Sequence, residues 1–204
     1  VVSWAKTTFG DAIAPNGRPI WQNFVTWFGD SKVVDAEGKP LVVYHGTATD
    51  NEGIFMPDEG VSYFSPNPRT ASNFANLHAR QGDGAHVLPV YLSLQNPFDF
   101  RNPTHRKLAV QWIENNVSPM SHWPLDTKKN ASDALKAGYY NIIEDPEMIQ
   151  MMLEKGFDGF TVRESTDGPI NYGVFDNRKV KSATGNNGNF DQVNPDITQS
   201  RAGL

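Results

Sequence analysis

The first part of the chain combines an aromatic stripe with repeated turn residues. In the segment 21–28, Trp-Gln-Asn-Phe-Val-Thr-Trp-Phe, aromatic residues stand at positions i, i+3, i+6 and i+7. This spacing predicts a short amphipathic helix whose aromatic side chains pack in the core rather than bind a ligand. A Phe-Gly-Asp pattern followed by a Gly-x-Pro turn occurs twice between residues 9 and 40. Because the two spacers differ in length, the pattern indicates a duplicated edge element and not a repeat protein.

Short apolar runs bounded by turn residues predict a series of short strands. The run Leu-Val-Val-Tyr at 41–44 follows a Gly-Lys-Pro turn and is followed directly by His45-Gly46-Thr47. Pro89 lies inside another of these strands and has no N–H to donate, which predicts a strand at a sheet edge or one with an irregular start. The further predicted strands are 61–65, 87–94, 157–162 and 172–175.

Helical segments are predicted between and after the first strands. They cover about 68–79, 104–116, 130–139 and 146–155. Ser65 or Asn67 would cap the first of these helices, and Gly156 would end the last. Strands therefore precede and follow a block of helices without strand–helix alternation, which indicates an α+β fold. The Asn-, Gly- and Asp-rich residues 182–204 are expected to lie over the surface or to fray.

Composition narrows the chemistry that this chain can perform. Its 204 residues are of the length of one domain, and they contain no Cys. Disulfides, thiolate nucleophiles and Cys-ligated zinc are therefore excluded, which leaves oxygen groups, imidazole or a bound cofactor. A net charge of −5 argues against nucleic acid as a partner, because phosphate contacts need clustered Lys and Arg. No apolar run approaches the roughly 18 residues of a membrane span, so no membrane partner is expected.

Several common catalytic and metal-binding motifs are missing from the sequence. The five histidines include no His-x-x-x-His pair and no His-Glu-x-x-His motif, so we predict no metal site. There is no Gly-x-x-x-x-Gly-Lys-Ser/Thr loop for nucleotide phosphates. There is also no Gly-x-Ser-x-Gly elbow to support a Ser-His-Asp triad.

His45 stands out by its neighbours. A lone histidine beside a strand is usually a core residue. Here it ends an apolar strand, and Gly46 would let a ligand approach the backbone closely while Thr47 adds a hydroxyl. Together these groups suit a polar planar ligand with ribose attached.

Two later segments give His45 a family context. Gly60-Val61-Ser62-Tyr63-Phe64-Ser65 followed by Ala71-Ser72-Asn73-Phe74-Ala75 resembles the second motif of the diphtheria-toxin-like and poly(ADP-ribose) polymerase-like ADP-ribosyltransferases. Tyr44-His45-Gly46-Thr47 resembles their first motif, and Ile170-Asn171-Tyr172-Gly173-Val174-Phe175-Asp176 resembles the third. The three motifs occur in the family's order, and the family carries His, Tyr and Glu at their key positions.

Shorter segments resemble one branch of this family more closely, the transferase domain of polyvalent phage proteins and related bacterial effectors. These segments are Trp27–Val34, Asn96–Asp99, Gly156–Gly159 and Lys181–Gly188. The resemblance implies two small packed antiparallel sheets with a helical insert. It divides the chain into an N-terminal extension packed on the core, a transferase domain with its insert, and a polar tail: 1–40, 41–181 with about 100–155 as the insert, and 182–204.

The resemblance also implies a set of residues that bind NAD as co-substrate. They are His45, Gly46, Thr47, Tyr63, Ser72 and Phe74. His45 would bond the adenosine ribose, and the Gly46 backbone with Ser72 would hold the carboxamide. Tyr63 and Phe74 would flank the nicotinamide ring, where aromatic stacking is favourable. Ordinary core packing is the alternative role for both aromatic residues.

Asn171 stands where the family normally has its catalytic Glu. An amide forms hydrogen bonds but carries no charge and accepts no proton. Three explanations follow from this departure. A carboxylate of the 163–169 loop, Glu164 or Asp167, supplies the missing charge; the transfer of a single ADP-ribose unit needs no base from the enzyme; or the domain binds without chemistry. A simple solvated loop is the alternative reading of Glu164 and Asp167.

The sequence therefore predicts an NAD-dependent mono-ADP-ribosyltransferase that acts on a protein, with His45, Tyr63, Asn171 and Glu164 as its catalytic residues. An NAD glycohydrolase and a catalytically silent NAD- or protein-binding module are the alternatives. Aromatic residues of the insert would either dock a protein target or pack among themselves; they are Trp112, Trp123, Tyr139 and Tyr140. The resemblance implies a protein that acts in the cytoplasm or is delivered into another cell as an effector or toxin.

Overall fold

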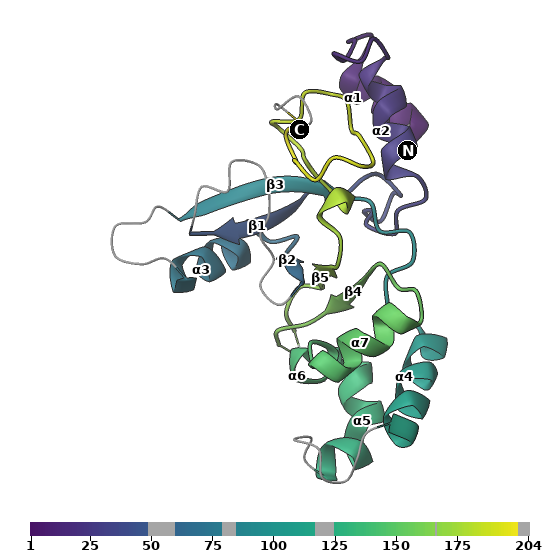
Figure 1. The fold of residues 1–204 in the computed structure, drawn as a ribbon. Helices are drawn as coiled ribbons and strands as arrows, with labels where there is room; N and C mark the ends of the chain where they lie inside the picture. Colours follow the sequence, from purple (N-terminus) through teal and green to yellow (C-terminus); the bar gives the residue numbers. More distant parts are fainter. Residues whose placement is uncertain (49–59, 79–84, 117–124, 166, 200–204) are drawn as a thin grey trace. The chain divides into compact units, whose positions relative to one another are not determined.

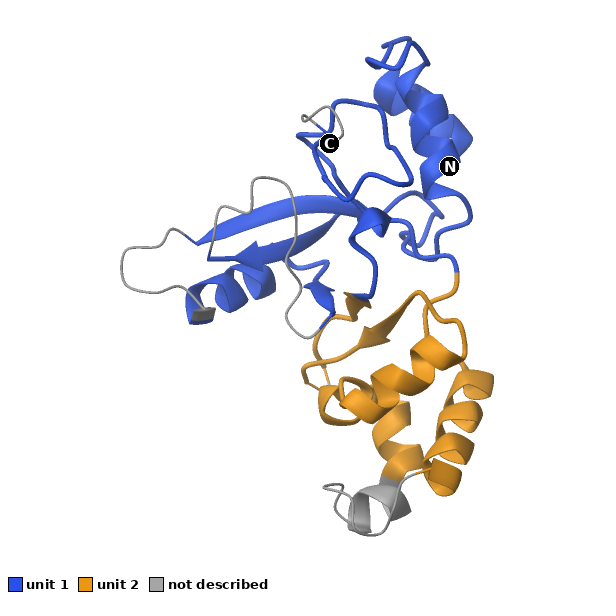
Figure 2. Ribbon diagram, in the orientation of Figure 1, with its two compact units in different colours: residues 1–95, 174–204 blue, residues 96–173 orange. Residues whose placement is uncertain are grey.

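The computed structural model describes residues 1–48, 60–78, 85–116, 125–165 and 167–199. These residues divide into two compact units (Figure 2). Unit 1 consists of residues 1–95 and 174–204, and unit 2 consists of residues 96–173.

Unit 1 contains a three-stranded antiparallel sheet covered by one helix. The strands are β1 (Val43–Thr47), β3 (His86–Leu92) and β6 (Val180–Ser182), in the order β1-β3-β6. His45 is opposite Leu88 in the register of β1 and β3, and Val90 is opposite Ser182 in that of β3 and β6. Helix α3 (Pro68–His78) lies against β1 and β3 (Figure 1). The short strand β2 (Ser62–Phe64) precedes it, and the 3₁₀ turn η1 (Asn177–Lys179) leads into β6.

The position of His45 and that of the third predicted strand differ from expectation. His45 lies inside β1 rather than after it, because pairing with β3 continues as far as Thr47. The strand that contains Pro89 is the middle strand of its sheet, so the predicted edge position is wrong. The Pro89 carbonyl accepts a hydrogen bond from the Ala183 N–H, 2.9 Å away. In a strand, the N–H and C=O of one residue point to the same side. The N–H that Pro89 lacks would therefore also point toward Ala183, which lies beyond the last residue of β6, so no strand hydrogen bond is lost.

Two helices precede the sheet and are built around aromatic side chains. They are α1 (Val2–Phe9) and α2 (Ile20–Phe28). The predicted aromatic stripe forms the buried face of α2, where Phe24 and Phe28 stack with ring centroids 5.2 Å apart. The repeated sequence pattern gives a repeated local structure, since each helix ends at a glycine, Gly10 or Gly29, with φ of +57° or +55°. Helix α1 was not predicted, and no side chain caps its first turn.

The segment after β6 is held by buried contacts as far as it is described. Phe190 is buried in the aromatic cluster with Phe24. Lys181 in β6 is fully buried, and its ammonium donates to the carbonyl oxygens of Asn194 and Asp196. The tail at 182–204 is expected to lie over the surface or to fray, and these contacts contradict fraying for its described residues, 182–199.

Unit 2 joins four helices to a pair of strands. The elements are α4 (Pro103–Asn116), α5 (Leu125–Ala137), α6 (Tyr140–Ile143), α7 (Pro146–Glu154), β4 (Gly159–Val162) and β5 (Asn171–Val174). The Asp145 carboxylate caps α7 by accepting from the Glu147 N–H at 2.9 Å, and Gly156 follows this helix as predicted. Strands β4 and β5 are neighbours in the second sheet. Helices together with two small antiparallel sheets confirm the α+β fold class.

Candidate functional site

Gly46 determines how closely α3 approaches β1 in unit 1. A Cβ atom at this position would lie 1.8 Å from the carbonyl oxygen of Ala71 and 3.1 Å from the amide nitrogen of Ala75. Any side chain would therefore push α3 away from the strand. On this side of the strand the space is occupied by the chain's own helix, so the close approach of α3 is one reason for a glycine at position 46. The close packing of α3 on Gly46 brings the first motif, on β1, next to the part of the second motif that α3 carries.

The backbone groups of Gly46 lie on the opposite edge of β1 from β3. Tyr44 exchanges two backbone hydrogen bonds with Ser65, at 2.8 and 2.9 Å. Because successive strand residues direct their N–H and C=O groups to alternate edges, those of Gly46 point to the same edge as those of Tyr44. This edge therefore offers the donor and acceptor that an amide ligand needs.

His45 is fixed in one tautomer by β2. Its Nδ1 lies 2.8 Å from the backbone carbonyl oxygen of Tyr63, and a carbonyl only accepts, so Nδ1 carries the proton. The imidazole also contacts the buried ring of Phe64, with centroids 5.3 Å apart. Burial lowers the pKa of His45, and the hydrogen bond to Tyr63 offsets this only in part. The ring is therefore neutral at pH 7, with Nε2 as its acceptor nitrogen.

The other predicted binding residues of unit 1 differ in how much they are exposed. Tyr63 and Phe74 are each 38% exposed, so neither is a core residue. In β2 the core position belongs to Phe64, which leaves Tyr63 on the outward side of the strand. Thr47 is buried at the end of β1, and Ser72 is half-buried on α3. Two exposed aromatic rings are thus presented by β2 and α3, the two elements that carry the second motif.

The third motif and the loop before it belong to unit 2. Asn171 begins β5 with a side chain only 4% exposed, and its amide donates a hydrogen bond to the carboxylate of Glu164. Burial raises the pKa of Glu164, and this hydrogen bond opposes the rise. The structure therefore brings together two of the predicted catalytic residues, Asn171 and Glu164. Asp167 is exposed, in keeping with the alternative of a solvated loop residue.

Sequence analysis missed a third group beside this pair, Glu144. It follows the last residue of α6, and burial together with the nearby Glu164 carboxylate raises its pKa to about 8. No short motif connects Glu144 to Glu164 or Asn171, because these residues are far apart along the chain. Only the fold could identify it.

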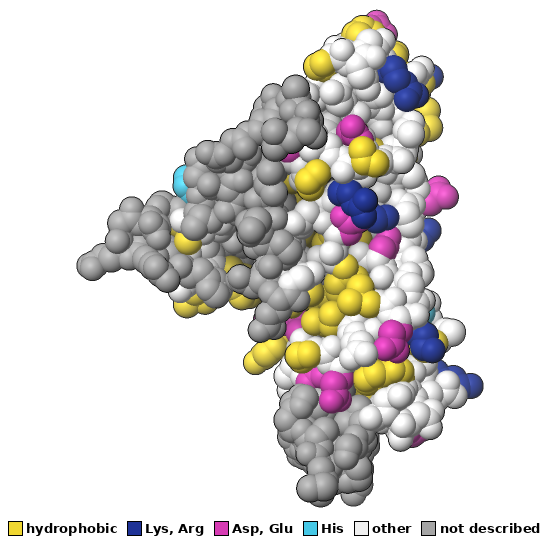
Figure 3. Space-filling model, in the orientation of Figure 1, with side chains coloured by type: hydrophobic (Ala, Val, Ile, Leu, Met, Phe, Trp, Pro, Cys, Tyr) yellow, Lys and Arg dark blue, Asp and Glu magenta, His cyan; other side chains and the backbone are white. Residues whose placement is uncertain are grey.

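The aromatic residues of the insert are partly exposed. Tyr139 and Tyr140 are exposed and Trp112 is half-buried, whereas Trp123 lies outside the described residues. On the face drawn in Figure 3, hydrophobic and acidic side chains lie beside one another over unit 2.

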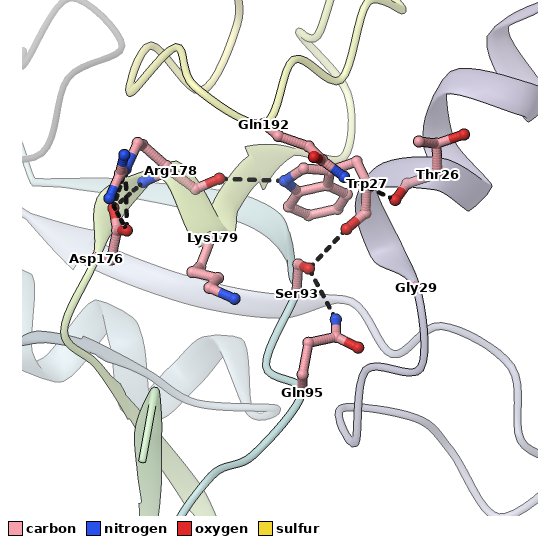
Figure 4. Close-up of a pocket in the computed structure, with 9 residues that line it drawn as sticks. All are labelled: Thr26, Trp27, Gly29, Ser93, Gln95, Asp176, Arg178, Lys179 and Gln192. Atoms are coloured by element: carbon pink, nitrogen blue, oxygen red, sulfur yellow. Dashed lines mark hydrogen bonds and ion pairs between the residues drawn. The ribbon is translucent and has the colours of Figure 1, made fainter. Parts of the chain in front are cut away.

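A pocket of about 440 Å³ in unit 1 contains none of the predicted residues (Figure 4). Its polar groups largely bond to one another. Asp176 pairs with Arg178 at 2.7 Å, the Trp27 indole donates to the Arg178 carbonyl, and Ser93 donates to the Trp27 carbonyl. These bonds connect α2, η1 and the end of β3. The polar groups that line the pocket therefore hold these elements together. Its residues are Thr26, Trp27, Gly29, Ser93, Gln95, Asp176, Arg178, Lys179 and Gln192.

Two searches of the described residues concern metals and membranes. In the part of the chain that the structure describes, no three His, Asp or Glu side chains gather into a group able to hold a metal ion. Within the same residues, no helix has the length and apolar character needed to cross a membrane.

Comparison with known proteins gives one match. A family model described as ADP-ribosyltransferase in polyvalent proteins matches residues 35–190. The matched range contains all three motifs and both units contribute to it. No curated protein and no solved structure matches the chain.

Proposed function

Because this chain belongs to the family of ADP-ribosyltransferases found in polyvalent proteins, we propose that it is a mono-ADP-ribosyltransferase that moves ADP-ribose from NAD to a protein. Members of this family use NAD as a substrate. The observation that carries the proposal is the joint of β1, β2 and α3, where the Tyr63 carbonyl holds His45 in a neutral tautomer and α3 packs on Gly46.

The groups of unit 1 fit the two ends of NAD. The neutral His45 ring offers Nε2 as an acceptor, which suits a ribose hydroxyl. The amide and carbonyl of Gly46, at the edge of β1, suit the carboxamide, and Ser72 and Thr47 add hydroxyls. The exposed rings of Tyr63 and Phe74 offer planar faces for nicotinamide. We propose that these residues bind and orient NAD.

The groups of unit 2 suit the chemical step. The bond between ribose C1′ and the nicotinamide nitrogen breaks, and its electron pair leaves with neutral nicotinamide. The nucleophilic atom of the acceptor bonds to C1′ and passes its proton to the Glu164 carboxylate. A carboxylate also stabilises the positive charge that develops on the ribose. We propose that Glu164 supplies the charge that Asn171 lacks, with Asn171 holding it in place.

Asn171 also favours transfer of a single ADP-ribose unit. Elongation into a polymer requires activation of a ribose hydroxyl, for which the family uses a Glu at this position. An amide accepts no proton, so this position does not serve as that base.

Titration with NAD followed by labelling tests the proposal. We expect NAD to bind in calorimetry, and absence of binding at millimolar concentration would contradict the enzyme hypothesis. Incubation with labelled NAD and cell lysate then separates the activities. Labelled protein supports the transferase, free ADP-ribose alone supports a glycohydrolase, and binding without either product supports a silent module. Intact mass and peptide mapping of the labelled protein identify the modified side chain.

A further inference from the structure

Backbone hydrogen bonds place Glu144 beside the loop that carries Glu164. The Arg163 N–H donates to the Gly138 carbonyl at 2.7 Å, and the Tyr140 N–H donates to the Arg163 carbonyl at 3.2 Å. One turn later, the Glu144 N–H donates to the Tyr140 carbonyl at 2.8 Å. The end of α6 and the start of the loop after β4 are thus one hydrogen-bonded piece. Glu144 and Glu164 both belong to this hydrogen-bonded segment, so the backbone keeps the two residues near each other.

The side chain of Asn171 lies beside Glu164, and one of its hydrogen-bonding atoms is not used within the described residues. Its amide nitrogen donates to Glu164, whereas its Oδ1 has no hydrogen-bond partner among the residues that the structure describes. The side chain is more than nine-tenths buried. The Oε1 atom of Glu144 is likewise buried without such a partner in the described part of the chain. Buried polar atoms of this kind call for an explanation, and Glu147 Oε2 on α7 is another among the described residues. Glu144 differs from Glu147 in having the Glu164 carboxylate beside it.

We propose that Glu144 is a positioning residue for the transfer reaction: its carboxyl keeps a proton so that the Glu144–Glu164 pair carries one negative charge, located on Glu164 beside Asn171. This inference rests on the proposed function. In this proposal the acidic group consists of two carboxyl groups, Glu144 at the end of α6 and Glu164 in the β4–β5 loop. It replaces a single Glu at position 171 of β5.

The electrostatics of the pair agree with this division of roles. Burial and the Glu164 carboxylate raise the pKa of Glu144 to about 8, so Glu144 is mainly protonated at neutral pH. The pKa of Glu164 is raised by burial, but the amide of Asn171 stabilises its ionised form. A Glu at position 171 would instead add a third carboxyl beside Glu164. An amide at position 171 therefore agrees with a carboxylate that acts from position 164 instead of from position 171.

Other charged groups on the surrounding elements are engaged in different contacts. Lys136 of α5 pairs with Asp133 at 3.3 Å, and the Arg163 guanidinium lies over the Phe100 ring. The remaining titratable groups described on these elements are Tyr139, Tyr140, Asp145, Glu147, Glu154, Lys155, Asp167 and Tyr172. Glu164 is the charged neighbour that raises the pKa of Glu144.

The proposal makes a specific prediction for alkaline pH. When Glu144 loses its proton, two like charges stand in a half-buried site, and their repulsion disturbs the hydrogen bond between Asn171 and Glu164. Wild-type turnover should then fall about tenfold for each pH unit above a transition near pH 8. Glu144→Gln, which keeps the shape of the protonated carboxyl, should retain its plateau beyond this transition.

The experiment measures nicotinamide release at saturating NAD from mildly acidic to alkaline pH for wild type, E144Q and the control E154Q. Glu154 is an exposed residue of the neighbouring helix α7, and E154Q should follow the wild-type profile. An E144Q profile that superimposes on that of wild type would overturn the inference. If Glu144 were only structural, E144Q would be less active than wild type at every pH, and its alkaline transition would stay at the same pH.

A second measurement separates failure of this inference from failure of the proposed function. Carbon-13 NMR of Glu-labelled protein follows each carboxyl directly, and the resonance missing from E144Q identifies Glu144. We expect this resonance to titrate near pH 8 in wild type and at lower pH in Glu164→Gln. Titration of Glu144 in the ordinary range would overturn the inference even if the enzyme is active. A raised titration in a protein that releases no nicotinamide would support the pair and contradict the proposed function.

Discussion

In unit 1 the predicted binding residues are held by neutral contacts, whereas the residues proposed for the chemical step in unit 2 are two carboxyl groups and an amide. The imidazole of His45 is fixed by a carbonyl oxygen, and the position of α3 depends on the missing side chain of Gly46. In unit 2, by contrast, Glu164 and Glu144 have raised pKa values, and Asn171 is bonded to one of them. The proposed function therefore divides into recognition of NAD by residues of unit 1 and negative charge supplied by residues of unit 2.

The same difference explains why the candidate residues of unit 1 form a recognisable motif, whereas Glu144 in unit 2 could not be found in the sequence. Close packing of a strand on a helix demands a fixed residue at a fixed spacing, which makes a local motif such as His45-Gly46-Thr47. A carboxyl group needs only to come near its partner in space. Its position in the sequence can therefore shift from one element to another without leaving a motif.

Removal of the Glu164 charge should give the largest effect and tests the division most directly. In Glu164→Gln the general base is lost, so turnover should fall on the order of 10²–10⁴-fold. NAD affinity should stay within about twofold of wild type, because the binding groups belong to unit 1. Single-turnover kinetics with calorimetry measure both quantities. Unchanged turnover, or loss of NAD binding in parallel with turnover, would break the proposed division.

Asp167→Asn is the matched control for this prediction. It removes a carboxylate from the same loop, but Asp167 is exposed. We expect turnover close to that of wild type. A large loss in D167N with a small loss in E164Q would transfer the role from Glu164 to Asp167.

A side chain at Gly46 should give the largest effect on stability. The added Cβ of Gly46→Ala would lie 1.8 Å from the Ala71 carbonyl oxygen, so α3 must move away from β1. We expect a loss of about 3 kcal/mol in the free energy of unfolding, at the upper end of the usual cost of overpacking. Urea denaturation measures it. In the control Gly185→Ala the nearest atom is Ser182 Oγ at 3.3 Å, and the loss should be about 1 kcal/mol or less.

The sequence predicted the elements of this fold better than their places in the sheets. The aromatic spacing at 21–28 gave α2, and the Asn67 carboxamide caps α3 by accepting from the Arg69 N–H at 2.9 Å, as one of the two predicted caps. The central position of the strand with Pro89 could not be predicted, because it depends on where β6 ends. Strand β6 itself is only three residues long, too short for a clear hydrophobic pattern.

The candidate site was likewise predictable only where local sequence determines it. His45, Tyr63 and Phe74 follow from motifs, and the exposure of the two aromatic residues decides against core packing. Glu164 was a candidate because it lies near Asn171 in the chain. Glu144 reaches the same place through the turn of α6, which no sequence pattern indicates.

The pH dependence of stability sharpens the picture of unit 2. The pKa of Glu144 is raised from 4.5 to about 8 in the folded protein, so between these values the folded state keeps a proton that the unfolded state releases. The free energy of unfolding therefore falls as pH rises through this window. Glu144→Gln should remove about 1–3 kcal/mol of this fall, after allowance for the exposed part of the side chain. Urea denaturation of E144Q and of the exposed control E154Q at both ends of the window measures it, and equal slopes for the two variants would contradict the assignment.

The smallest effect should come from His45, and it tests the neutral character of unit 1. Removing one hydrogen bond to a ribose hydroxyl in His45→Ala should weaken NAD binding about fivefold, since such a bond is worth roughly 1 kcal/mol. Because burial lowers the pKa of His45, wild-type affinity should stay constant as pH falls through 6.5 and decline only at lower pH, when Nε2 gains a proton and ceases to accept. Calorimetry across this range, with the exposed His86→Ala as control, measures both effects. A decline in affinity already centred at the ordinary histidine pKa would show that a solvated histidine, and not the half-buried His45, governs binding. It would contradict the neutral character of the binding groups proposed in unit 1.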